Sequence, residues 1–153
     1  MIAHPMHGAG VIESIEKKKI NGVTREYYVL RMPVGGMLVM IPVSNTEEIG
    51  VRPIISEEQA DEIIDSINDI EVDMSQNWNR RYRENMLRIK SGDLTEVARV
   101  VKGLMARDEE RGLSTGERKM LRNAKQILIS EIFLSKHSTY DEIEEKINAA
   151  MSC

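Results

Sequence analysis

The segment from Asn77 to Arg83 combines the residue types that are most typical of contact with a nucleic acid. Within it lie the only tryptophan of the chain, one tyrosine and three arginines, namely Trp78, Tyr82, Arg80, Arg81 and Arg83. Arginines bind phosphates, and planar side chains stack on bases or wedge between them. A tryptophan that begins an amphipathic stripe is also a common core anchor, and helical arginines are commonly solvated. DNA contact and a purely structural role therefore both stay open for this segment.

A second group of basic residues strengthens the DNA hypothesis. Its members are Arg118, Lys119, Arg122 and Lys125. Positions 118, 122 and 125 share one face of a helix, at spacings of i, i+4 and i+7. Like charges stacked in this way repel one another, which favours a polyanionic partner that neutralises them. Lys119, Arg122 and Lys125 are therefore added to the candidate DNA contacts.

The distribution of charge points to the same part of the chain. The net charge of −4 at pH 7 does not by itself favour a nucleic acid. Residues 1–70, however, hold six basic and eleven acidic residues, a balance of −5, whereas residues 78–125 hold thirteen basic and seven acidic residues, a balance of +6. This asymmetry indicates a local site for a polyanion.

No combination of residues predicts catalysis, a metal centre or a cofactor. His4 and His7 are two candidates where a metal needs three or four ligands, so turn or surface histidines are expected. The segment Gly8-Ala9-Gly10 lacks the Gly-Lys-Ser/Thr end of a phosphate loop and predicts a tight turn instead. Cys153, at the end of the chain, has no expected base beside it. We therefore expect that the protein is not an enzyme.

Length and composition indicate a folded protein with one ordinary domain or two small ones. The chain has 153 residues, of which 41% are hydrophobic and 30% are charged. A single cysteine fits a reducing cytoplasm, and no apolar run approaches the roughly 18–20 residues of a membrane helix. The N-terminus has neither the basic start nor the apolar stretch of a signal peptide. We therefore expect a soluble, cytoplasmic protein.

The front of the chain is predicted to form strands. Segments 11–16, 24–32 and 37–41 are rich in β-branched, aromatic and other apolar residues, and 49–52 is expected to add an edge strand. Asn21-Gly22 predicts a two-residue hairpin turn, because both residues tolerate positive φ angles. Closely spaced strands with tight turns predict a small barrel, because closure removes exposed edges. A unit of about 50 residues is expected to lean on a neighbour or a partner for its core.

The rest of the chain is predicted to form about five helices. Capping residues are expected at Ser56, Asp93, Ser114 and Thr139, and Gly112 is expected to end a helix. Trp78, Tyr82, Met86 and Ile89 repeat at helical spacing, after a connection over residues 71–77. The predicted class is therefore α+β, with a β domain over residues 1–53 and a helical domain over residues 54–153.

Three motifs, taken in order, resemble the CarD/CdnL family of bacterial transcription regulators. Residues 4–12 resemble the family's Tyr-Pro-x-His-Gly-x-Gly start, which is shared with the polymerase-binding module of the transcription-repair coupling factor. Residues 77–83 resemble its Asn-Trp-x-x-Arg-Tyr segment, and residues 111–121 its Arg-Gly-Leu-Ser-x-x-Glu-x-x-Met-Leu stretch. The coupling factor shares only the front module, so the helical back half favours CarD.

The resemblance implies two binding surfaces. The front barrel would be of the Tudor-like or SH3-like kind. It would bind the β subunit of RNA polymerase by adding strand to strand, at a surface that includes Lys18, Val39, Met40 and Ile41. Trp78 would wedge into the minor groove of promoter DNA at the upstream edge of the transcription bubble. The nearby backbone would be held by Arg80, Arg81, Arg83 and Lys125.

A protein that binds melted promoter better than closed promoter shifts the equilibrium toward the open complex. DNA binding by the free protein is expected to be weak. The alternative is a protein-binding scaffold, in which the barrel binds a partner and Trp78 belongs to the core.

Overall fold

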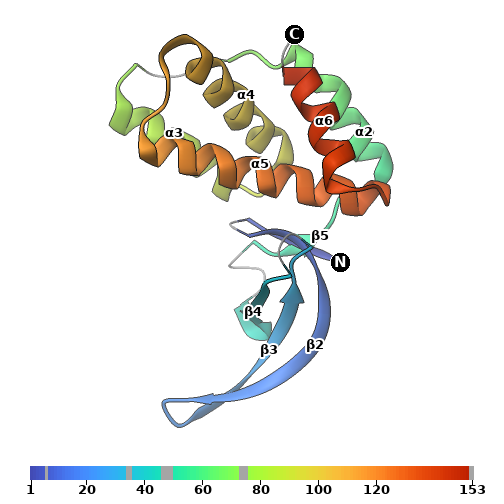
Figure 1. Ribbon diagram of the computed structural model, residues 1–153. Helices are drawn as coiled ribbons and strands as arrows, with labels where there is room; N and C mark the ends of the chain where they lie inside the picture. The colour runs from blue at the N-terminus through green and yellow to red at the C-terminus, as the bar shows by residue number, and fades with distance from the viewer. Residues whose placement is uncertain (6, 34–35, 46–49, 73–75, 152–153) are drawn as a thin grey trace.

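The computed structural model describes residues 1–5, 7–33, 36–45, 50–72 and 76–151. Within these residues a five-stranded antiparallel sheet is followed by five α-helices. Figure 1 shows the two units, with the helices gathered at one end of the molecule and the sheet at the other. The predicted α+β class, with a β-rich front and a helical back, is confirmed.

The sheet has the spatial order β4-β3-β2-β1-β5. Its strands are β1 (Ile2–His4), β2 (Gly8–Ile20), β3 (Val23–Arg31), β4 (Leu38–Pro42) and β5 (Arg52–Pro53). Although β1 has only three residues, it pairs with β2 on one side and β5 on the other. The predicted edge strand over 49–52 lies partly outside the described residues, and only Arg52 of it belongs to β5. Leu30, Met32 and Ile41 form the small core of the sheet.

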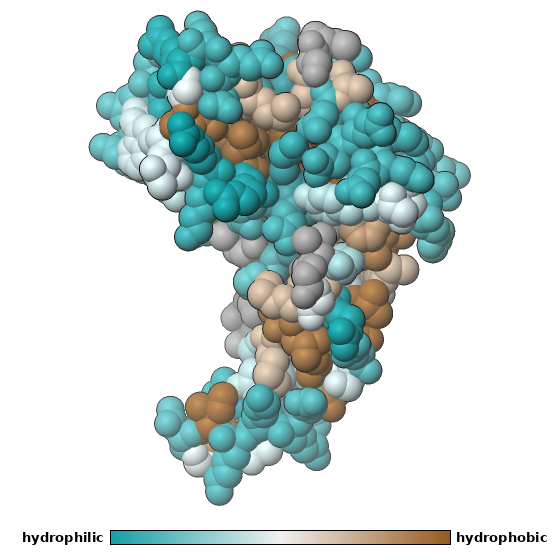
Figure 2. All heavy atoms as spheres, viewed as in Figure 1, coloured by the Kyte–Doolittle hydropathy of each residue, from teal (hydrophilic) through white to brown (hydrophobic). Residues whose placement is uncertain are grey.

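The hairpin of β2 and β3 projects away from the helices (Figure 1). It turns at Asn21 and Gly22, whose φ angles of 52° and 80° confirm the predicted turn. Because β4 pairs only with residues 27–31 of β3, the outer part of the hairpin has just two strands. Figure 2 shows a hydrophobic patch at the hairpin tip, where Ile20 and Val23 are exposed.

The helices begin close to the predicted positions. They are α2 (Glu57–Ser66), α3 (Trp78–Lys90), α4 (Leu94–Arg111), α5 (Thr115–Lys136) and α6 (Tyr140–Met151), with short 3-10 turns η1 (Val43–Asn45) and η2 (Ile67–Asp69). The side chains of Ser56, Asn77, Asp93 and Ser114 each accept a hydrogen bond from a first-turn N–H group. All five helices contribute to one buried apolar core. None of the described helices has both the length and the apolar character that crossing a membrane requires.

The start of β2 packs directly on α5. The Ala9 N–H donates a hydrogen bond to Ser130 Oγ at 3.2 Å, and a Cβ atom at Gly8 would lie 2.7 Å from that same oxygen. The predicted tight turn at Gly8-Ala9-Gly10 is wrong, because these residues begin β2 and pair with β1. The close approach of strand and helix explains the small residue at Gly8, whereas a Cβ atom at Gly10 would lie 2.7 Å from the Arg31 carbonyl oxygen of β3.

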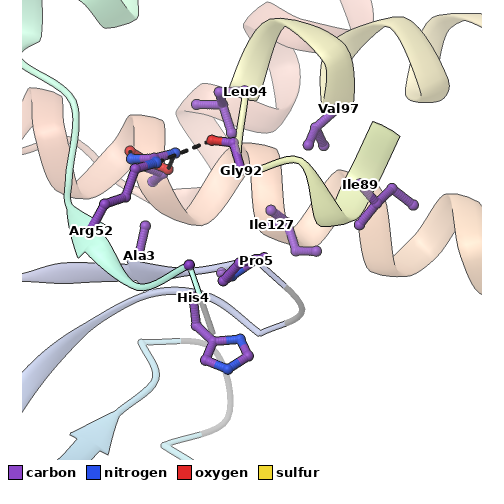
Figure 3. A pocket seen from close by; sticks show the side chains of 12 residues that line it. Ala3, His4, Pro5, Arg52, Ile89, Gly92, Leu94, Val97 and Ile127 are labelled. Carbon is purple, nitrogen blue, oxygen red and sulfur yellow. Dashed lines mark hydrogen bonds and ion pairs between the residues drawn. The ribbon is translucent and has the colours of Figure 1, made fainter. Parts of the chain in front are cut away.

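A buried carboxylate completes the joint between the two units. Glu131 of α5 is 2% exposed and accepts two hydrogen bonds from Arg52 of β5, at 2.6 and 2.8 Å. It also accepts the Ile55 N–H at 2.9 Å, while Arg52 Nε donates to the Gly92 carbonyl at 3.1 Å. Figure 3 shows Arg52 pointing toward Gly92. The cavity left there, about 10 Å³, has room for roughly one water molecule, so the joint is closely packed.

Candidate nucleic-acid interface

Trp78 is the first residue of α3, and its indole ring is held in place by its N–H edge. Its Nε1–H donates a hydrogen bond to Ser114 Oγ at 3.0 Å, and its ring stacks on Tyr82 with centroids 5.1 Å apart and planes 19° from parallel. The side chain nevertheless stays 43% exposed. Of the two sequence interpretations, a core tryptophan is therefore wrong, and a fixed, outward-facing indole is what the fold provides.

The acceptor of the Trp78 hydrogen bond is itself part of a buried network. Ser114 caps α5 by accepting the Glu117 N–H at 3.2 Å. The Glu117 carboxylate accepts hydrogen bonds from Arg81 Nε at 2.8 Å and Arg81 Nη2 at 3.0 Å. The hydrogen bonds from Arg81 lower the pKa of Glu117, against the opposing effect of burial. The network thus links the start of α3 to the start of α5 directly beneath Trp78.

The prediction that Arg81 contacts DNA is wrong. Its side chain is 2% exposed and is paired with Glu117, so it has no surface to offer a phosphate. Arg81 belongs with Asn85 and Ile89 to the buried face of α3, at spacings of i, i+4 and i+8. The spacing of eight residues between Arg81 and Ile89 was the signal in the sequence that both could lie on the buried face. An arginine, however, is almost never fully buried without a partner. That partner, Glu117, lies 36 residues away in the sequence.

Four of the other candidate residues surround the exposed part of α3. Arg80 is exposed and forms an ion pair with Glu84 at 3.0 Å. Arg83 lies next to Trp78 along the outer face of α3. Across Tyr82, on α5, Lys119 and Arg122 are exposed and line a groove between the two helices.

Lys125 is partly buried. It lines neither the groove between α3 and α5 nor the hollow beside Trp78 and Arg83. Arg118, which shares its helical face with Arg122, is exposed. The fold therefore brings the basic residues of two distant segments onto one surface around Trp78 and Tyr82. We call this surface, made by Trp78, Tyr82, Arg83, Lys119 and Arg122, the basic aromatic surface.

The residues predicted for polymerase binding lie on the sheet. β4 is the last strand at one edge, and no described strand pairs with its outer side. Val39 and Met40 are partly buried, whereas Ile41 is 2% exposed in the core of the sheet. Ile41 could therefore meet a partner only through its backbone. Lys18 lies opposite Arg25 across the hairpin, which places two cations side by side on an exposed ribbon.

His4 and His7, the two histidines near the start of the chain, lie in contact with each other. The rings of His4 and His7 lie 4.5 Å apart, and burial, followed by the charge of His7, lowers the pKa of His4. Over the described ranges, His, Asp and Glu side chains form no group of three that could hold a metal ion. Cys153 lies outside the described residues.

The chain is similar to known proteins along nearly its whole length. The model for the CarD-like/TRCF RID domain matches residues 1–55, and the model for the CarD C-terminal domain matches residues 48–148. "Putative transcription factor YdeB" of Bacillus subtilis (strain 168) is 39% identical over 143 residues, which cover 94% of each chain. The matches together span both units of the fold.

Proposed function

Since this chain belongs to the CarD family, we propose that it regulates transcription by binding the β subunit of RNA polymerase and stabilising the open promoter complex. The family match supports the coarser statement, a transcription-related role that involves RNA polymerase. In the proposal the sheet binds polymerase, and the basic aromatic surface contacts DNA at the upstream edge of the bubble. We also propose a division into domains at residues 53 and 54.

The observation that carries the proposed DNA contact is that the Trp78 side chain is exposed and yet held in one orientation. Wedging side chains partly unstack a base step, which costs a few kcal/mol. An indole already held by Ser114 and stacked on Tyr82 loses little conformational entropy on insertion. Arg83, Lys119 and Arg122 supply cations for the phosphates on either side. The surface thus combines a wedge with backbone contacts, which is what recognition of a DNA fork requires.

The polymerase part is supported by the free edge of β4 and by the hairpin. An unpaired strand edge is a template for strand addition, in which main-chain hydrogen bonds supply the affinity. Like charges directly opposite each other destabilise a strand pair. An acidic partner would relieve the repulsion between Lys18 and Arg25. The exposed Ile20 and Val23 at the tip would add apolar contact area.

A promoter-opening assay with RNA polymerase tests the proposal. Wild-type protein is expected to increase the fraction of open complex, and Trp78→Ala to lose most of this effect while still binding polymerase. A loss of about 1.4 kcal/mol of differential binding corresponds to a tenfold shift. Val72→Ala, which truncates another exposed apolar residue, is the control and should act like wild type. Full activity of Trp78→Ala, or no binding of wild type to the β subunit, would contradict the proposal.

A further inference from the structure

We propose that the groove between α3 and α5 receives one unpaired base of single-stranded DNA beside Trp78. The inference rests on the proposed function, because a melted promoter supplies the unpaired base. It goes further by assigning a nucleotide site to a groove that is also lined by Met86, Met120, Asn123 and Gln126, which the proposed function does not use.

The groove has the size and floor of a small-ligand site. Its volume is about 460 Å³, within the range of roughly 300–1,000 Å³ that such sites occupy. Tyr82, Met86 and Met120 line it with an aromatic ring and two thioethers. Aromatic rings stack on bases of any sequence, and thioethers pack well against rings. The floor therefore suits a flat, polarisable group such as a nucleobase.

Gly116 keeps the aromatic end of the groove open. It lies in the first turn of α5 without a positive φ angle, so the backbone does not require glycine there. Glycine is a poorer helix former than alanine, which makes its presence costly unless space is needed. A Cβ atom at this position would lie 3.7 Å from Trp78 Cζ2 and 3.8 Å from Tyr82 Cε2. A longer side chain would therefore occupy the space beside both rings.

The polar lining matches a nucleotide rather than an apolar ligand. The amides of Asn123 and Gln126 can both donate and accept hydrogen bonds, as the edges of bases require. Lys119 and Arg122 place two cations at the same groove, where a phosphate would be neutralised. No acidic side chain is found among the described residues that line it. This combination of ring, amide and cation favours a base with its own phosphate.

Paired bases cannot use this site, because their faces are covered by neighbouring base pairs and their Watson–Crick edges by the partner strand. A base at the end of a melted segment has lost both constraints. Trp78 borders the groove, because its Cζ2 atom lies 3.7 Å from the place that a Cβ atom at Gly116 would occupy. A wedge at a DNA fork would therefore leave the first unpaired base at the groove entrance. The base site and the wedge therefore act on neighbouring positions of one strand.

Three DNA probes test the inference with the 153-residue chain by fluorescence anisotropy at low ionic strength. The first is a duplex, the second a fork, and the third the same fork with an abasic nucleotide at its first unpaired position. Wild type is expected to bind the fork at least about fivefold more tightly than the abasic fork, because stacking on an aromatic ring is lost. Equal binding of the two forks would overturn the inference and leave the proposed function standing.

Variants assign the effect to this groove. Asn123→Leu and Gly116→Leu should each remove the difference between the two forks while keeping a preference for fork over duplex. Asn79→Leu makes the same change on the other side of Trp78 and should behave like wild type. Loss of the base dependence only in Asn79→Leu, or its persistence in both groove variants, would also overturn the inference. Wild type that shows no preference for fork over duplex would contradict the proposed function itself, and the base site with it.

Discussion

Replacing Arg81 by methionine tests whether the buried ion pair holds the start of α3 against α5. Both partners are 2% exposed and share two hydrogen bonds of 2.8 and 3.0 Å. Without the guanidinium, the Glu117 carboxylate stays in the interior with little more than the Ser114 hydroxyl, 3.4 Å away, as a donor. Removing one partner of a buried pair typically costs about 3–5 kcal/mol. Because whole proteins are stable by only about 5–15 kcal/mol, we expect a drop in melting temperature on the order of 10 °C.

The control is the neighbouring arginine, which is also paired on the same helix. Arg80 binds Glu84 at the surface, where such pairs contribute about 0–1 kcal/mol. Arg80→Met should therefore change the free energy of unfolding very little. The double variant Arg81→Met with Glu117→Leu removes both charges and should recover most of the loss.

Urea unfolding followed by tryptophan fluorescence measures these differences. Trp78 is the only tryptophan and donates a hydrogen bond to Ser114, so its emission reports on this network directly. Acrylamide quenching of Trp78 in the folded Arg81→Met protein should also increase, because the Ser114 acceptor is no longer fixed. An Arg81→Met variant as stable as Arg80→Met, or a double variant as unstable as Arg81→Met alone, would refute the reasoning.

Four further perturbations have defined outcomes. Gly8→Ala should destabilise the protein by about 1–3 kcal/mol in thermal unfolding, because its Cβ would lie 2.7 Å from Ser130 Oγ and its φ angle is 85°. Because the pKa of Glu117 is lowered in the folded protein, its ionised carboxylate stabilises the fold at pH values above its ordinary pKa of 4.5. This stabilisation is lost as pH falls through the folded-state pKa. Acid titration should therefore show a smaller loss below pH 4.5 in the Arg81→Met/Glu117→Leu protein. The lowered pKa of His4 means that stability also falls as pH decreases from 6.5, and His4→Gln should remove that step. Glu131→Gln, which leaves Arg52 with a neutral partner, should cost about 1–3 kcal/mol.

Local signals in the sequence predicted the helix starts and the hairpin. Ser56 and Asp93 accept hydrogen bonds from N–H groups two or three residues ahead, and Asn21 and Gly22 adopt the φ angles that their types favour. These features depend on neighbours in the chain, so propensity alone is enough. The Gly8-Ala9-Gly10 segment was mispredicted because its small residues are required by distant parts of the chain. Gly8 and Ala9 lie against Ser130, which is 121 residues away from Ala9, and Gly10 lies against Arg31.

The side-chain stripe of α3 shows where periodicity fails. Trp78, Tyr82, Met86 and Ile89 were predicted as one face, yet only Ile89 is fully buried. The buried face instead passes through Arg81, whose burial depends on a counter-charge from another helix. Hydrophobic spacing cannot reveal such a partner. The sequence therefore identified the segment that carries the exposed tryptophan, but not the residues that hold it.

The joint at Glu131 bears on how a weak DNA contact could have a large effect on promoter opening. Arg52 and Glu131 connect the sheet to α5, and α5 carries Ser114 as its cap and Lys119 and Arg122 on its surface. If the sheet is bound to polymerase, as we propose, contact between Trp78 and the fork becomes an intramolecular event. Short, well-fitting connections give effective concentrations in the millimolar range or above. A wedge and a few cations that bind free DNA poorly would then be almost fully engaged in the promoter complex, and stiffness at the joint would be as necessary to the mechanism as the indole itself.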